Sequence, residues 1–136
     1  MISEHNIEIR FADIDAMGHV NNAVYLSYFE QARIKYFADL GGSWDWKSQG
    51  ILLAKNVVEY YLPILLNDHV VIKTKCIGIG GKSLTFSYLI QRIHRGELQA
   101  CSKGESVLVC FDSVKGKTIE VPEEWRNAIK VEAPKW

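Results

Sequence analysis

The chain has 136 residues, of which 48% are hydrophobic and 24% charged, and its 16 basic side chains equal its 16 acidic ones. This length fits a single domain over residues 1–136, and the composition excludes a disordered or low-complexity chain. The zero net charge argues against a nucleic-acid-binding protein, and no apolar run approaches the ~20 residues of a membrane span, so neither nucleic acid nor a membrane is an expected partner.

The first expected element is a short strand over residues 7–12, where apolar and polar side chains alternate. Residues 13–22 are polar and contain a glycine, which predicts a loop. A helix is then predicted from about Asn22 to Leu40, with Asn21 or Asn22 as its N-cap and Gly41–Gly42 as its stop. Most of its circumference is apolar or aromatic, so we expect the rest of the domain to wrap it.

The remainder of the chain is predicted to be mostly strand. Four segments are rich in β-branched and aromatic residues: 51–62, 69–79, 84–95 and 97–111. Their short connections require antiparallel neighbours, because a parallel crossover needs a dozen or more residues. A brief helix is predicted from Pro122 to Lys130. The sum is an α+β architecture in which a curved antiparallel sheet of about five strands wraps one long helix, and pairing of exposed sheet edges predicts at least a dimer.

The cysteines and the N-terminus both favour the cytoplasm. Cys76, Cys101 and Cys110 are far apart and form no C-x-x-C pair, so we interpret them as buried apolar residues rather than metal ligands. An odd number of cysteines favours a reducing compartment. The first residues also lack the basic segment and apolar stretch of a secretory signal.

The most unusual chemistry lies in residues 13–22, just ahead of the predicted helix. This loop holds two carboxylates, Asp13 and Asp15, together with His19 and the pair Asn21–Asn22. A helix N-terminus offers unpaired N–H donors and a positive dipole end, which suit the developing negative oxygen of an attacked ester-like carbonyl. A carboxylate beside that end can act as a general base or a nucleophile. Gly18 suits a tight turn that brings the backbone close to a ligand.

The residues alone leave three explanations of this loop open. Asp and Asn before a helix commonly cap it or stabilise a turn. Asp13, Asp15 and His19 together would suit a divalent metal ion. The third explanation is an acid–base site, in which Asp13 would either raise the pKa of one of the two carboxylates by repulsion or simply form a turn hydrogen bond.

Residues 11–25 (FADIDAMGHVNNAVY), continuing through 29–33 (FEQAR), closely resemble the hotdog-fold thioesterases of the 4-hydroxybenzoyl-CoA thioesterase type. Residues 61–64 (YLPI) and 67–68 (ND) also resemble that family, so the similarity covers essentially the whole chain. The resemblance implies the hotdog fold and hydrolysis of acyl thioesters of coenzyme A or acyl carrier protein, without a metal or cofactor. It also implies dimers or tetramers with active sites at the subunit interface.

By position, the resemblance assigns the catalytic carboxylate to Asp15, with His19 and Asn22 beside it. His19 and the Asn pair are similar to the acyl-carrier-protein thioesterases of plants, whereas Met17 stands where those enzymes have Asn. Substrate contacts are expected from three further positions, Gly18, Val20 and Tyr25. The last of these fits equally well as a core aromatic residue.

Other positions are open between substrate-binding and structural roles. Glu59, on an expected strand, is either a polar wall of the site or a charged residue on a solvent face. Lys82 and Ser83 either contact the coenzyme A tail or form an exposed turn. They do not belong to a P-loop, because the earlier glycine is absent and a strand follows. Glu30 and Arg33 are expected to form a structural i,i+3 ion pair.

We therefore predict an acyl-CoA thioesterase. The alternative is a hotdog module that binds acyl-CoA without hydrolysing it. Asp15 beside His19 argues against that alternative, since pure binding needs no base there. A dehydratase acting on hydroxyacyl thioesters ranks third, because its sites usually place a His and an Asp in a different helix arrangement.

Overall fold

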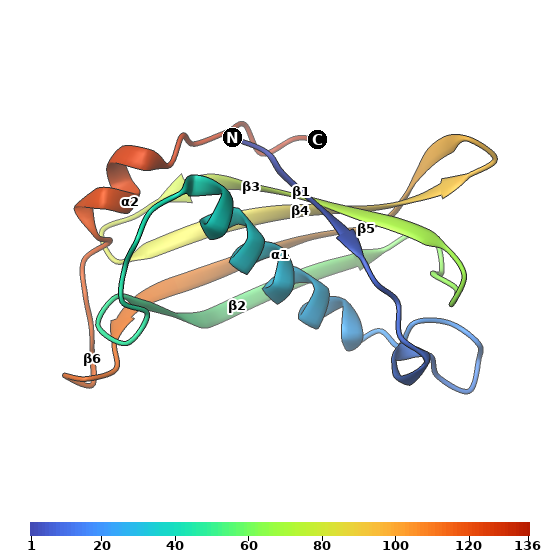
Figure 1. Ribbon diagram of the computed structural model, residues 1–136, viewed down its shortest axis with the longest axis horizontal. Coiled ribbons are helices and arrows are strands. Elements are labelled where there is room, and N and C mark those ends of the chain that lie inside the picture. Colours follow the sequence, from blue (N-terminus) through green and yellow to red (C-terminus); the bar gives the residue numbers. More distant parts are fainter.

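One long helix lies across an antiparallel sheet in the computed structural model, which describes residues 1–136 (Figure 1). The sheet order is β1-β3-β4-β5-β2, and the short strand β6 pairs with β5. Every strand pairing is antiparallel. The strands are β1 (Ser3–Ile7), β2 (Gly50–Tyr60), β3 (His69–Ile79), β4 (Ser83–His94), β5 (Glu97–Asp112) and β6 (Lys117–Thr118). The helices are α1 (Val24–Leu40), α2 (Glu123–Ala128) and the 3-10 turn η1 (Phe11–Asp13). The expected α+β architecture is confirmed.

The central helix α1 ends where the sequence predicts but begins differently. Gly41 adopts a left-handed backbone with φ of +73°, which stops the helix. At the other end the N-cap is Ala23, so the prediction of an asparagine cap is wrong. Asn21 instead accepts a hydrogen bond from the Ala23 N–H at 2.9 Å and so stabilises the turn that leads into the helix.

The core lies between α1 and the concave face of the sheet. Alternate residues of β4 point toward the helix and are fully buried: Leu84, Phe86, Tyr88 and Ile90. Phe29 of α1 stacks on Tyr88 with ring centroids 4.3 Å apart. The sheet does not wrap the helix completely, because Ile34 remains 61% exposed on the side of α1 that faces away from this core.

The predicted strand over residues 7–12 is wrong. The strand lies earlier, at Ser3–Ile7, where it pairs with β3. The chain then turns through η1, which covers residues 11–13. The Asp13 carboxylate stabilises this turn by accepting a hydrogen bond from the Arg10 N–H at 3.0 Å. The alternating pattern of residues 7–12 therefore does not reflect sheet pairing.

Strand β2 forms one edge of the sheet, since it pairs only with β5. Its pairing shifts between Leu53 and Lys55, and Leu52 and Leu53 are both about half exposed. The outer backbone groups of this edge are free to pair with another strand. None of the helices has the length and apolar character needed to cross a membrane.

Candidate active site

The loop between η1 and α1 folds into a tight hairpin. Ile14 bridges Val20, the Asp15 N–H donates to the His19 carbonyl at 2.9 Å, and the Gly18 N–H donates to the Asp15 carbonyl at 3.0 Å. Gly18 has a φ of +80°, a left-handed conformation that glycine adopts without strain. This hairpin places the backbone of Asp15 opposite that of His19.

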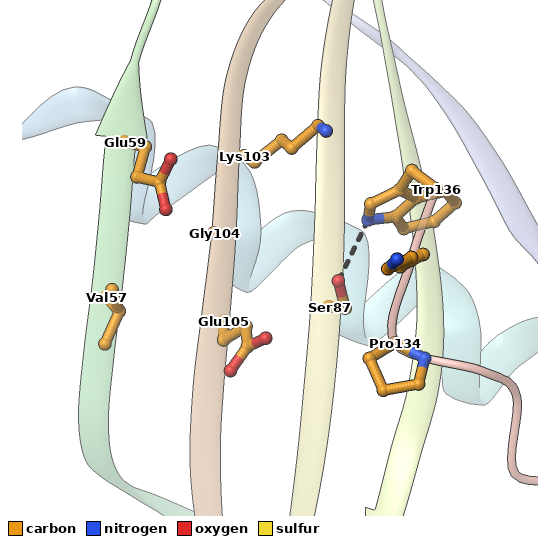
Figure 2. Close-up of a pocket in the computed structure, with 9 residues that line it drawn as sticks. Val57, Glu59, Ser87, Lys103, Gly104, Glu105, Pro134 and Trp136 are labelled. Carbon is orange, nitrogen blue, oxygen red and sulfur yellow. Dashed lines mark hydrogen bonds between the residues drawn. The ribbon is translucent and has the colours of Figure 1, made fainter.

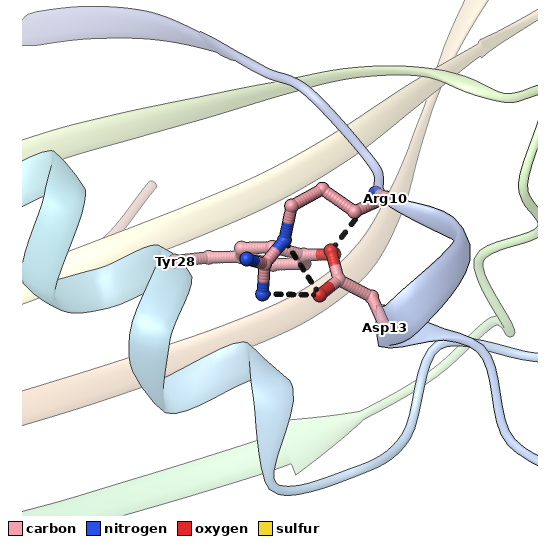
Figure 3. Close-up of polar contacts among 3 residues, drawn as sticks. All are labelled: Arg10, Asp13 and Tyr28. Atoms are coloured by element: carbon pink, nitrogen blue, oxygen red, sulfur yellow. Dashed lines mark hydrogen bonds and ion pairs between the residues drawn. The ribbon is translucent and has the colours of Figure 1, made fainter.

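Asp13 is buried, and its carboxylate is used by contacts with Arg10 and Tyr28 (Figure 3) rather than available for chemistry. Its carboxylate accepts hydrogen bonds from the Arg10 side chain at 2.8 and 3.1 Å and from the Tyr28 hydroxyl at 2.9 Å. Burial alone would raise the pKa of Asp13, but the hydrogen bonds from Arg10 and Tyr28 outweigh it and hold that pKa below its usual value. Asp13 is thus a structural carboxylate that ties the loop to α1.

Asp15 is only half-buried, and its contacts are fewer. One carboxylate oxygen, Oδ1, accepts the Met17 N–H at 2.9 Å. The other oxygen, Oδ2, accepts no hydrogen bond from the chain. Met17 itself is 77% exposed and contributes only its backbone. One oxygen of the carboxylate is therefore held in place and the other has no partner in the chain, and Asp15 itself lines none of the five principal cavities of this single chain.

A cavity of about 320 Å³ lies beside this hairpin at the N-terminal end of α1. It is lined by His19, Val20, Asn22, Tyr25, Tyr60, Tyr61, Leu62 and Pro63. The N–H of Tyr25, in the first turn of α1, has no acceptor in the chain. The cavity therefore combines an imidazole, an amide side chain and the positive end of the central helix.

Tyr25 is a core aromatic residue, as one of its two predicted roles requires, and it also lines this cavity. It is only 2% exposed, and its ring meets the ring of Tyr60 edge-on with centroids 4.9 Å apart. Burial raises the pKa of Tyr25 to about 12, so its hydroxyl stays protonated at neutral pH.

Tyr60 belongs to the cavity but was missed by the sequence reasoning. Its hydroxyl donates to the Asn22 carbonyl at 2.8 Å and so ties the end of β2 to the start of α1. The signal for it in the sequence is its position directly before residues 61–64, which resemble the family motif.

Glu59 lies on the opposite face of the sheet from the helix. Its neighbour Tyr60 points toward α1, and side chains of a strand alternate between faces. Glu59 instead lines a cavity of about 560 Å³ on the outer face, with Lys103 and the C-terminal Trp136 (Figure 2). The structure therefore does not bring Glu59 to the cavity beside His19.

The connection from β3 to β4, which contains Lys82 and leads into Ser83, lies at the other end of the sheet from the loop that precedes α1 (Figure 1). The Gly80 N–H closes this β3–β4 turn by donating to the Ser83 carbonyl at 2.8 Å. The hairpin that carries Asp15 is instead bonded to the segment before β3, because the Val20 N–H donates a hydrogen bond to the Ile64 carbonyl. One chain alone does not unite these two parts of the predicted site.

The metal-binding explanation has no support in the geometry. Asp13 is committed to Arg10 and Tyr28, and no group of three His, Cys, Asp or Glu side chains is arranged to hold an ion. The three cysteines are free and buried.

Comparisons with known proteins agree with this architecture. The sequence model described as the Thioesterase-like superfamily matches residues 9–129. An acyl-CoA thioester hydrolase, YbgC of Escherichia coli O157:H7, is 31% identical over 125 residues, which cover 86% of this chain and 87% of YbgC. A second relative, the uncharacterized protein YsmA of Bacillus subtilis, is 27% identical over 92% of this chain and 83% of its own.

Two solved structures extend the comparison. A thioesterase from Thermus thermophilus, crystallised with coenzyme A and Zn, is 39% identical with a TM-score of 0.79, covering 93% of this chain and 90% of its own. A mutant 4-hydroxybenzoyl CoA thioesterase with bound 4-hydroxybenzoyl CoA superposes with a TM-score of 0.86 over 95% of this chain and 99% of its own. At 18% identity, this second structure shows a common fold.

Proposed function

The chain belongs to the Thioesterase-like superfamily and hydrolyses acyl-CoA thioesters, and we propose that Asp15 supplies the carboxylate for this reaction. The observation that carries the assignment is the half-buried Asp15 carboxylate, which has one oxygen fixed by the Met17 N–H and the other free, opposite His19. The acyl-CoA hydrolase YbgC and the thioesterase crystallised with coenzyme A support the substrate class.

The free oxygen of Asp15 can serve hydrolysis in two ways. As a general base it removes a proton from water while the water oxygen adds to the thioester carbon. As a nucleophile it adds to that carbon itself, and water then cleaves the resulting anhydride. In both routes the carbon–sulfur bond breaks and coenzyme A departs as the thiolate.

The start of α1 would stabilise the oxygen that becomes negative during this addition. The Tyr25 N–H is an unused donor at the positive end of a 17-residue helix. His19 and Asn22, which line the adjacent cavity, would orient the thioester against that donor. Gly18 and Val20 keep the hairpin close enough for these contacts.

The complete site would need a second copy of the chain. If the free edges of two β2 strands pair antiparallel about a two-fold axis, the Tyr60 end of one meets the Gly50 end of the other. The β3–β4 turn of the second copy then approaches the Asp15 hairpin of the first. In such a dimer Lys82 and Ser83 can contact the phosphates of coenzyme A, which they cannot do within one chain. A tetramer would be two such dimers.

The buried free thiols of Cys76, Cys101 and Cys110 are compatible with a reducing compartment, so we place the enzyme in the cytoplasm.

The function is tested by measuring thiol release from a panel of acyl-CoAs and from the corresponding acyl carrier protein thioesters. Turnover of acyl-CoA is expected, and the panel also identifies the preferred acyl group and carrier. Tight binding of every acyl-CoA without thiol release would support the non-catalytic binding module instead. A single turnover in oxygen-18 water then separates the two routes, since only the nucleophilic one can leave the label in the Asp15 carboxylate.

A further inference from the structure

Arg33 is a buried cation that has no carboxylate partner. It is only 7% exposed, and its Nη1 donates to the Tyr88 hydroxyl at 3.2 Å and the Ser106 hydroxyl at 3.4 Å. Its Nε and Nη2 atoms donate to no acceptor in the chain, and no acidic side chain lies within ion-pair distance. These two nitrogens are not sealed inside the fold but reach the groove that Arg33 lines. A guanidinium held largely out of water beside neutral groups gains most from an anionic partner, which an anion from outside the chain can supply there.

The unpaired donors border a groove between α1 and the edge strand β2. The groove has a volume of about 430 Å³, and its lining is mostly apolar: Ile34, Phe37, Trp46, Ile51, Leu52, Leu53 and Leu108. Several of these side chains are roughly half exposed, among them Ile34, Leu52 and Trp46. An apolar surface of this kind, beside an unpaired strand edge, is typical of a covered interface.

Glu30 lines the same groove and lacks a partner as well. It lies one turn before Arg33 on α1, is exposed, and forms no ion pair or hydrogen bond with any side chain. The predicted i,i+3 ion pair between Glu30 and Arg33 is therefore absent, because Arg33 turns inward to Tyr88 and Ser106. One helix thus presents an unpaired anion and an unpaired cation to one groove.

A two-fold axis converts this arrangement into two matching contacts. In an isologous interface, a contact from one residue to a second is repeated in the reverse direction. We propose that a second copy of the chain covers the groove and that its Glu30 carboxylate pairs with the Arg33 guanidinium, twice across the axis. This inference rests on the dimer proposed above and not on the hydrolytic role of Asp15. The inference adds Glu30 and Arg33 as the residues that fix the register of the two copies.

The energetic test uses Glu30, because this exposed side chain can be changed without disturbing the core. Glu30→Gln is expected to raise the dimer dissociation constant at least tenfold, measured by sedimentation, since two desolvated ion pairs are lost. Glu30→Arg is expected to raise the dissociation constant further. The swap Glu30→Arg/Arg33→Glu is expected to restore most of the lost affinity. Gln31→Arg, which introduces the same side chain at the next, exposed position of α1 outside the groove lining, is the control and is expected to leave the constant unchanged.

A geometric test does not depend on these energies. In the double variant Glu30→Cys/Arg33→Cys, mild oxidation is expected to give a covalent dimer on a non-reducing gel, while the native cysteines stay buried. The control pair Gln31→Cys/Lys35→Cys is expected to remain monomeric on that gel.

Specific results would overturn the proposal. An unchanged dissociation constant in Glu30→Gln and Glu30→Arg would contradict the cross-subunit ion pair but not the dimer itself. A wild-type protein that stays monomeric at all concentrations would overturn both the cross-subunit pair and the dimer. Hydrolysis would still be tested separately by the thiol-release assay. If Arg33→Met selectively lost turnover of acyl-CoAs with a terminal carboxylate, and Glu30→Gln had no effect, the anion would come from the substrate and the proposal would be wrong.

Discussion

Two neighbouring polar segments, residues 10–13 and residues 15–22, give their carboxylates opposite environments. In the first, the Asp13 carboxylate is buried and accepts hydrogen bonds from Arg10 and Tyr28 (Figure 3). In the second, Asp15 is half-buried and leaves one oxygen free beside His19. A carboxylate whose acceptor sites are filled stabilises the fold, whereas one with an open oxygen is available for proton or acyl transfer.

The difference also explains how the site stays in place. Arg10 and Tyr28 fix the first segment to α1 through Asp13, and the second segment begins only two residues later. The hairpin that carries Asp15 is therefore anchored on one side by the buried Asp13 carboxylate, which the exposed Arg10 and the buried Tyr28 both contact, and on the other by the start of the helix. Rigid support close to the reacting group is what a preorganised active site requires.

The largest expected effect comes from Asp15→Asn. The amide still accepts the Met17 N–H but is neither a base nor a nucleophile, so kcat for acyl-CoA hydrolysis should fall by about 10³-fold with the unfolding free energy nearly unchanged. Asp45→Asn is the matched control, because Asp45 accepts the Lys47 N–H in the same way on an exposed loop and should change neither quantity. Full turnover in Asp15→Asn would remove this residue from the mechanism.

The next effect concerns stability. Asp13→Ala is expected to lower the unfolding free energy by about 2–3 kcal/mol, because the Tyr28 hydroxyl and the Arg10 side chain lose their shared acceptor. Urea denaturation of this variant beside Asp15→Asn measures the contrast directly. Equal stability of the two variants would contradict the division of roles between the carboxylates.

A smaller effect is expected at His19, which lines the cavity but has no fixed side-chain partner. His19→Ala should reduce kcat/KM by about tenfold, a loss typical of a group that assists rather than performs proton transfer. Steady-state kinetics with a single acyl-CoA provides the measurement. A loss as large as that of Asp15→Asn would instead make His19 an equal member of the catalytic pair.

The smallest effect is a pH dependence of stability. The folded-state pKa of Asp13 lies below its unfolded value, so its stabilising contribution is present above that unfolded value, 3.8, and is lost as the pH falls through the folded pKa. The unfolding free energy of the wild type should therefore fall more steeply under acid conditions than that of Asp13→Asn. Denaturation of both proteins at neutral pH and near pH 3 measures this. An equal drop in unfolding free energy between the two pH values in both proteins would contradict the prediction.

Much of the fold followed from local patterns in the sequence. The apolar run up to Leu40 and the glycine at 41 defined α1, and alternating apolar residues with short connections defined β2 to β5 nearly to their ends. These features depend on periodicity and turn chemistry, which act over a few residues. The tight turn expected at Gly18 followed as well, since Gly18 adopts a left-handed backbone between Asp15 and His19.

The sequence by itself determined the central helix and the four long strands β2 to β5, and it indicated the loop in which we propose the chemistry. Only the tertiary structure decided that Asp13 is sealed while Asp15 is open, that Glu59 faces away from the helix, and that Arg33 turns to Tyr88 rather than to Glu30. The physical reason is that these outcomes depend on partners distant in the sequence, such as Tyr28 for Asp13 and Ser106 for Arg33, which meet only when helix and sheet pack together.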